Sequence, residues 1–130
     1  MTTAPPPRRL ALLLWSADPS RPELCATPFA IAAAAAALDA EVEIHFAARS
    51  VLLLAGETAA QMTAGPAGSR PIADFIADAR AAGVRCYACH ASIAAWGIAP
   101  ADCGDRLDGI SGSTSFADRA LDPAWETLVF

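Results

Sequence analysis

The sequence contains no lysine and no asparagine, and all nine of its cationic side chains are arginines. Without lysine the chain can form neither a Schiff base nor the lysine contact of a phosphate-binding P-loop. Without asparagine it has no N-glycosylation site and no Cys-His-Asn triad. These absences exclude several classes of enzyme before any motif is considered.

Long apolar runs and basic clusters are also missing. The uncharged stretches 24–38 and 86–101 are broken by proline or histidine, and both are shorter than the roughly 18 apolar residues that a membrane helix needs. The net charge is −5, and the arginines are scattered singly except for the pair at 8–9. We therefore expect the protein to bind neither membranes nor nucleic acid.

The N-terminal residues resemble a signal peptide, because two arginines precede the apolar run 10–15. That run is shorter than the roughly 7 to 15 residues of a signal-peptide core, and no A-x-A cleavage site follows it. We expect a flexible proline-rich tail over 1–8, a single domain over 9–130 and a cytoplasmic location. In that reducing compartment the four cysteines are free, catalytic or metal-bound rather than paired for structure.

Apolar residues follow strand and helix patterns in turn along the chain. Continuous or alternating apolar residues predict strands over 9–16, 41–47, 84–89, 106–110 and 125–130. Helix-forming composition or helical spacing predicts helices over 22–38, 71–83 and 113–121, and short helices that begin at Ser50 and near residue 91 or 92. This order predicts an α/β fold of three layers around a mostly parallel sheet of about five strands.

Three details refine this prediction. The continuous apolar run at the first strand is typical of a central strand buried on both faces. In the second strand, Glu43 and His45 alternate with apolar residues, which indicates a half-exposed strand at an edge of the sheet, with His45 on its polar face. In the last helix, Ser115 and Asp118 have the spacing of a capping box.

The segment RCYACHAS at 85–92 contains C-x-x-C-H, the pattern of c-type haem attachment, and C-x-x-C, the pattern of dithiol oxidoreductases. On a strand, Cys86 and Cys89 lie about 10 Å apart and face opposite sides, whereas a disulfide needs Cα atoms within about 7 Å. Haem attachment requires export, which the N-terminus does not support. A metal site is disfavoured because the cysteines and the histidine fan out along the strand. We expect neither a metal nor another cofactor.

A single functional cysteine, Cys89, is the remaining interpretation. It ends the predicted strand immediately before a helix, and helix N-termini favour anions such as a thiolate. Sites in open parallel sheets lie beyond the carboxyl ends of the strands, where the winding direction switches. We therefore expect Cys89 and the loop 16–21 to border one crevice.

Several segments resemble the DsrE-like sulfur-trafficking proteins, the DsrE/DsrF/TusD superfamily. GVRCYACHASIAAWGI at 83–98, followed by DRLDGISGSTSFADRALDPAWETLVF at 105–130, is similar to their C-terminal half, in which a strand ends in a cysteine and a glycine-rich loop leads to the last helix and strand. The first strand, the alanine-rich helix and the second strand resemble their opening segments. The likeness covers residues 9–130.

The resemblance implies a flavodoxin-like fold, a homo-oligomer of three or six subunits, and an active cysteine that maps onto Cys89. It implies a sulfur carrier or sulfurtransferase of intracellular sulfur metabolism, which holds sulfane sulfur as a persulfide without a cofactor. TusA-like carriers and rhodanese-like donors are the partners it suggests. The alternative is a non-catalytic oligomeric binding or scaffold protein of the same fold, whose cysteines are only structural.

Other residues are candidates for the pocket around Cys89: His90, Ser92, Arg49, Cys25, Gly112 and Ser113. His90 would act as a cation beside the thiolate, and Arg49 would add positive potential at the same end of the sheet. Each also has a structural interpretation. Cys25 is either a second sulfur site or a buried thiol, while Gly112 and Ser113 either line the pocket or cap the last helix. Cys86 is expected in the core, and no role is assigned to Cys103.

Overall fold

The computed structural model describes residues 4–130 of the chain. Five strands form one sheet in which every neighbouring pair is parallel, in the order β4-β3-β2-β1-β5. The strands are β1 (Arg9–Leu14), β2 (Glu41–Phe46), β3 (Arg85–Cys89), β4 (Gly109–Ser111) and β5 (Glu126–Val129). The predicted α/β fold with a parallel sheet of five strands is confirmed.

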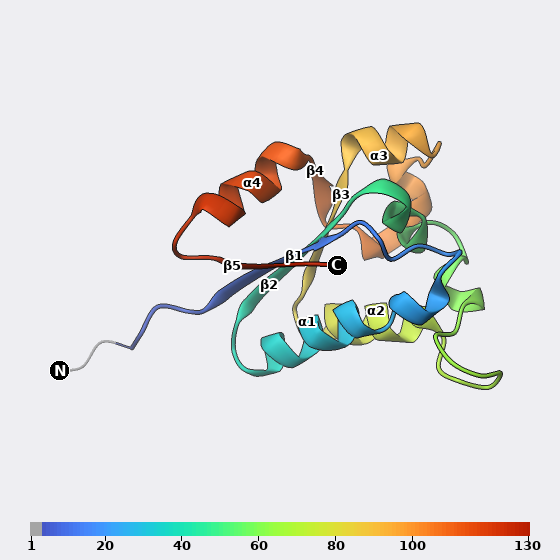
Figure 1. The fold of residues 1–130 in the computed structure, drawn as a ribbon, viewed down its shortest axis with the longest axis horizontal. Coiled ribbons are helices and arrows are strands. Elements are labelled where there is room, and N and C mark those ends of the chain that lie inside the picture. Colours follow the sequence, from blue (N-terminus) through green and yellow to red (C-terminus); the bar gives the residue numbers. More distant parts are fainter. Residues whose placement is uncertain (1–3) are drawn as a thin grey trace.

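Helices cover both faces of the sheet (Figure 1). On one face α1 (Thr27–Ala37) packs beside α2 (Ile72–Ala81), and on the other face α4 (Ser113–Leu121) crosses the sheet. The short helix α3 (His90–Ala95) follows directly from the end of β3. Segments of 3₁₀ helix complete the connections: η1 (Pro22–Leu24), η2 (Ala48–Leu54), η3 (Ala59–Gln61) and η4 (Pro100–Arg106).

The apolar core lies between the sheet and the pair α1 and α2. Leu12 and Leu14 of β1 and Ile44 of β2 are fully buried there, and the ring of Phe29 stacks on that of Phe46 with centroids 5.9 Å apart. Burial of each such side chain contributes about 1.5–3 kcal/mol to folding. The first strand is interior, between β2 and β5, as its continuous apolar run predicts.

The opposite face of the sheet carries charged groups at its centre. Glu43 and His45 of β2 are only 8% and 5% exposed, and β2 lies between β1 and β3. The prediction of an edge strand is therefore wrong. The alternation predicts which residues share a face of the sheet. Whether that face is buried depends on α4, which lies near the C-terminal end of the chain.

A partly buried ion pair joins α4 to this face. Nε and Nη2 of Arg119 donate to the two carboxylate oxygens of Glu43, both at 3.1 Å, and Nε2 of His45 lies 2.9 Å from Oε2 of the same carboxylate. Burial raises the pKa of Glu43, but the hydrogen bonds from Arg119 and His45 outweigh it and hold the pKa below its usual 4.5. The ring of His45 packs between Tyr87 and Phe116, with centroids 5.5 and 5.7 Å away.

Several helix boundaries differ from the sequence predictions. The helix predicted over 22–38 divides into η1 and α1, with Pro28 in the first turn of α1. The short helix expected from Ser50 is the 3₁₀ segment η2. α4 begins at Ser113 after Gly112, and no side chain caps it. The predicted capping box is wrong, because Ser115 and Asp118 already lie within the helix.

The N-terminal part of the chain is described from residue 4. Of the predicted tail 1–8, residues 1–3 lie outside the described residues, and residues 4–8 form no helix or strand. The carbonyl of Arg8 accepts a hydrogen bond from the N–H of Glu41, so the sheet contacts begin there. None of the helices over 4–130 has the length and apolar character that crossing a membrane requires.

Replacing Glu43 with Gln is expected to remove the charge that holds Arg119. Because the folded-state pKa of Glu43 is depressed, its ionised form stabilises the protein above about pH 4.5, and this contribution is lost as the pH falls through the folded-state value. We expect E43Q to lower the free energy of unfolding by about 2 kcal/mol at neutral pH, and the deficit to shrink in acid. Urea titrations at a series of pH values measure this; a deficit that does not change with pH would contradict the ionised pair.

Candidate functional site

Cys89 is the last residue of β3 and the residue that precedes α3. All four cysteines are free thiols, and Cys89 is the partly exposed one, whereas Cys25, Cys86 and Cys103 are fully buried. Cys86 belongs to the core on the α1 and α2 side of the sheet. The two cysteines of the C-x-x-C pattern therefore face opposite sides of β3, as the strand geometry predicts.

The surroundings of Cys89 favour its thiolate. Burial raises the pKa of Cys89, but hydrogen bonds from the Ser92 hydroxyl and from the N–H groups of Ser92 and Ala91 outweigh it, so the pKa lies below the usual 9.0. The Ser92 oxygen accepts a hydrogen bond from the N–H of Ala48 at 2.9 Å, which leaves its own proton for the sulfur.

The buried cysteines behave in the opposite way. Burial raises the pKa of Cys25 and of Cys86 to about 11, and it also raises the pKa of Cys103. The thiolate is the reactive form of cysteine. Cys89 is therefore the cysteine suited to nucleophilic chemistry at neutral pH.

A pocket of about 210 Å³ opens beside Cys89, between the carboxyl ends of the strands and the start of α4. Most of its wall is apolar, and its polar groups are the thiol of Cys89, the ring of His45 and the hydroxyls of Ser111 and Ser113. Ser111 of β4 is the register neighbour of Cys89. The remaining lining residues are Leu13, Phe46, Ala47, Gly112, Phe116 and Ala117.

The model of the DsrE/DsrF-like family matches residues 10–130. The chain belongs to the DsrE/DsrF-like family. A search of curated proteins finds no match. Among solved structures, the chain is similar to MTH1491 of Methanobacterium thermoautotrophicum, described as a protein of unknown function: the TM-score is 0.67 at 18% identity, over 94% of this chain and 98% of that one. At this identity the likeness shows the fold alone.

Three of the candidate residues of this DsrE/DsrF-like protein lie close to the thiol or its pocket. Gly112 and Ser113 line the pocket wall at the start of α4. The hydroxyl and the N–H group of Ser92 lower the pKa of Cys89. The glycine-rich segment and Cys89 thus line one cavity, although Gly112 lies 23 positions after Cys89 in the chain.

The other three candidates lie elsewhere. His90 is exposed in the first turn of α3, and it does not line the pocket. The guanidinium of Arg49 stacks over Trp96 at 4.8 Å and pairs with Asp18 at 3.5 Å. Cys25 is buried, and its sulfur donates to the carbonyl of Asp18 at 3.4 Å, so it is held as part of the core.

The cavity beside Cys89 is lined by none of residues 16–21, which were expected to border it. Ser16 and Ala17 line a different hollow, together with Phe130 and the start of α1. The reason is the strand order: β2 separates β1 from β3, so the residue after β2, Ala47, occupies the position beside Cys89.

His45 is the pocket residue that the sequence analysis missed. Its ring forms part of the wall beside Cys89, whereas the sequence indicated a solvent-facing position. The available signal was its spacing from Glu43, since an acid two residues before a histidine on one strand shares its face. Among residues 4–130, no three side chains of His, Cys, Asp or Glu are grouped so that they could bind a metal ion.

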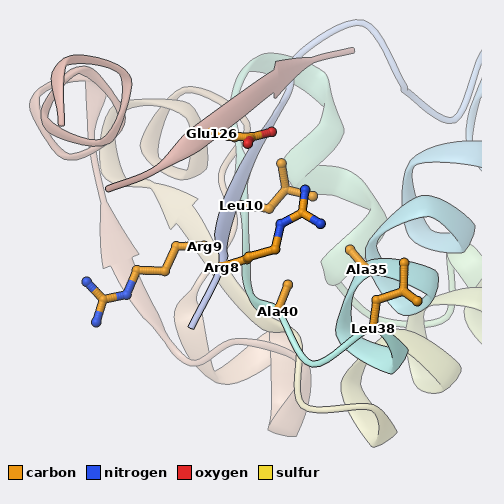
Figure 2. Close-up of a pocket in the computed structure, with 7 residues that line it drawn as sticks. All are labelled: Arg8, Arg9, Leu10, Ala35, Leu38, Ala40 and Glu126. Carbon is orange, nitrogen blue, oxygen red and sulfur yellow. The ribbon is translucent and has the colours of Figure 1, made fainter. Parts of the chain in front are cut away.

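A second hollow, of about 100 Å³, lies at the amino ends of the strands (Figure 2). Figure 2 shows the guanidinium of Arg8 on the same side of the strand as Leu10 and that of Arg9 on the other side. Arg9 pairs with Glu41 at 3.0 Å. No cysteine or histidine lines this hollow, so it lacks a group for thiol chemistry.

Replacing Ser92 with Ala is expected to raise the pKa of Cys89, because the thiolate loses its side-chain donor. The alkylation rate of Cys89 by iodoacetamide at neutral pH should fall by about tenfold. This is the effect expected from the loss of one hydrogen bond to a charged group. Mass spectrometry of the alkylated peptide over a pH series measures it. Ser113→Ala changes a pocket serine that does not lower the pKa of Cys89. It is the matched control and should leave the rate unchanged, whereas an unshifted profile in S92A would contradict the assignment.

Proposed function

We propose that this DsrE/DsrF-like protein is a sulfur carrier, a sulfurtransferase that holds sulfane sulfur as a persulfide on Cys89 and passes it to a partner protein in intracellular sulfur trafficking. The observation that carries the proposal is the contrast among the cysteines: one thiol with a lowered pKa opens onto a pocket, while three with raised pKa values are buried. Family membership, which implies a sulfur-relay context, supports it.

The chemistry is thiol exchange at a sulfane sulfur. The Cys89 thiolate attacks the outer sulfur of a donor persulfide R–S–SH. A bond forms between Cys89 and that sulfur, the donor's S–S bond breaks, and R–S⁻ leaves, so that Cys89–S–SH remains. One cysteine suffices for this exchange, because the sulfur only changes partner and no intramolecular disulfide is needed.

The pocket suits both halves of such a transfer. Its apolar wall limits the access of water to a loaded persulfide. The lowered pKa of Cys89 also makes it a good leaving group when the sulfur is handed on, since a thiol with a lower pKa leaves faster.

The partners fit the same scheme. We infer a rhodanese-like donor and a TusA-like acceptor, in the cytoplasm, with the protein itself a homo-oligomer of three or six subunits. Exposed apolar side chains at the sheet edge support an interaction surface there: Val129 and Leu128 on the edge strand β5 are 58% and 41% exposed, and Trp15 after β1 is 56% exposed.

Incubating the reduced protein with polysulfide, or with thiosulfate and rhodanese, is expected to increase its intact mass by about 32 Da, the mass of one sulfur. Peptide mapping should place the sulfur on Cys89, and C89S should not be loaded. Cys25→Ala, which removes a buried thiol, is the control and should load normally.

Loading that persists in C89S would contradict the assignment of the carrier residue. A wild-type protein that accepts no sulfur from either donor would favour the scaffold alternative, in which all four cysteines are structural.

A further inference from the structure

One nitrogen of His45 has no partner. Among residues 4–130, Nδ1 of His45 is the one buried side-chain nitrogen or oxygen that makes no hydrogen bond, and the side chain is only 6% exposed. Leaving a buried polar atom unpaired costs about 1–3 kcal/mol. Such an atom beside a pocket points to a ligand that pairs with it.

Glu43 determines which nitrogen of His45 carries the hydrogen. The pKa of Glu43 is lowered, so its carboxylate is ionised at neutral pH and can only accept hydrogen bonds. Nε2 of His45, 2.9 Å from Oε2, must therefore donate, and Arg119 holds the carboxylate in place from α4. In the neutral ring Nδ1 then has no hydrogen and presents a lone pair.

The contact with Glu43 indicates on which side of the ring this lone pair lies. Glu43 precedes His45 by two residues on the same face of β2, so Nε2 points toward the amino end of the strand. Because the two ring nitrogens point away from each other, we expect Nδ1 on the side of the carboxyl end, where His45 and Cys89 are lining residues of one cavity. Tyr87 and Phe116, packed on the ring, hold this orientation.

We propose that Nδ1 of His45 accepts the proton of a thiol that enters the Cys89 pocket, which makes the pocket a site for thiol-bearing sulfur acceptors. The inference rests on the proposed carrier function and adds to it the chemical class of the acceptor and the residue that activates it. Cys89 needs no such help, because Ser92 and the N–H groups around it already favour its thiolate.

The transfer is balanced in protons and electrons. An acceptor R–SH gives its proton to Nδ1, and R–S⁻ attacks the outer sulfur of Cys89–S–SH. The new R–S bond forms, the bond to Cys89 breaks, and Cys89 leaves as a thiolate. Cys89–S–SH, R–SH and neutral His45 thus become Cys89–S⁻, R–S–SH and protonated His45, without an oxidant or a reductant.

The groups around the ring favour this exchange. The titratable or charged side chains that face His45 are Glu43 on β2, Tyr87 and Cys89 on β3, and Arg119 on α4. Of these, Glu43 contacts the ring directly, and its negative charge stabilises the imidazolium that forms. Glu43 and Arg119 are positioning residues in this scheme, since neither reaches the thiol itself.

The test follows sulfur release from the loaded protein to 2-mercaptoethanol between about pH 6 and pH 9, in wild type and in His45→Gln. Glutamine keeps a donor for Glu43 but offers no titrating base. We expect H45Q to release sulfur about a hundredfold more slowly at neutral pH, the usual contribution of a general base. Its rate should rise with the thiolate fraction of the acceptor and approach that of wild type at the alkaline end.

The controls separate this inference from the function on which it rests. His90→Gln, the same change at the exposed histidine of α3, should leave the pH profile unaltered. Equal rates in wild type and H45Q, or a deficit of the same size at every pH, would overturn the role of His45. Failure of the wild type to load sulfur would instead overturn the carrier function.

A measurement on the unaltered protein covers the case in which H45Q does not fold. Nitrogen-15 NMR of wild type reports the tautomer of His45 directly. We expect hydrogen on Nε2 and none on Nδ1 in the neutral ring, and the opposite tautomer would overturn the inference.

Discussion

The bidentate ion pair between Glu43 and Arg119 is the interaction on which the site depends. It joins the centre of the sheet to a helix 76 residues later in the chain. A carboxylate buried on a sheet face is costly unless it is paired and fully hydrogen-bonded, so the pair requires α4 to lie across that face. The start of α4, with Gly112 and Ser113, is thereby brought to the carboxyl ends of the strands beside Cys89.

The same carboxylate links structure to chemistry. By accepting from Nε2 of His45, Glu43 leaves Nδ1 of the same ring without a hydrogen-bond partner. Separate contacts with Ser92 and the backbone lower the pKa of Cys89. Different contacts thus position the two residues: the β3 to α3 connection positions Cys89, and Glu43 with α4 positions His45. Both residues line one cavity.

Much of the fold could be predicted from local patterns, but less of the site. The alternation of strands and helices, the interior position of β1 and the opposite faces of Cys86 and Cys89 all follow from chain geometry over a few residues. Cys25, Arg49 and His90 were candidates by position along the chain, and the structure places none of them in the pocket. Proximity in sequence to a strand end does not determine which way a side chain faces or which strands are neighbours.

For His45, the local sequence determines one property of the residue and the tertiary structure determines another. Residues 41–46 alone determine that it shares a strand face with Glu43, because side chains alternate along any strand. Whether that face is exposed to water or covered by protein depends on the strand order and on the packing of α4. Both arise from contacts between distant segments, which no short sequence pattern encodes. The sequence by itself determined the parallel α/β framework and the place of Cys89 at a strand end; only the tertiary structure decided that its thiol is partly exposed and that a buried histidine lines the same cavity.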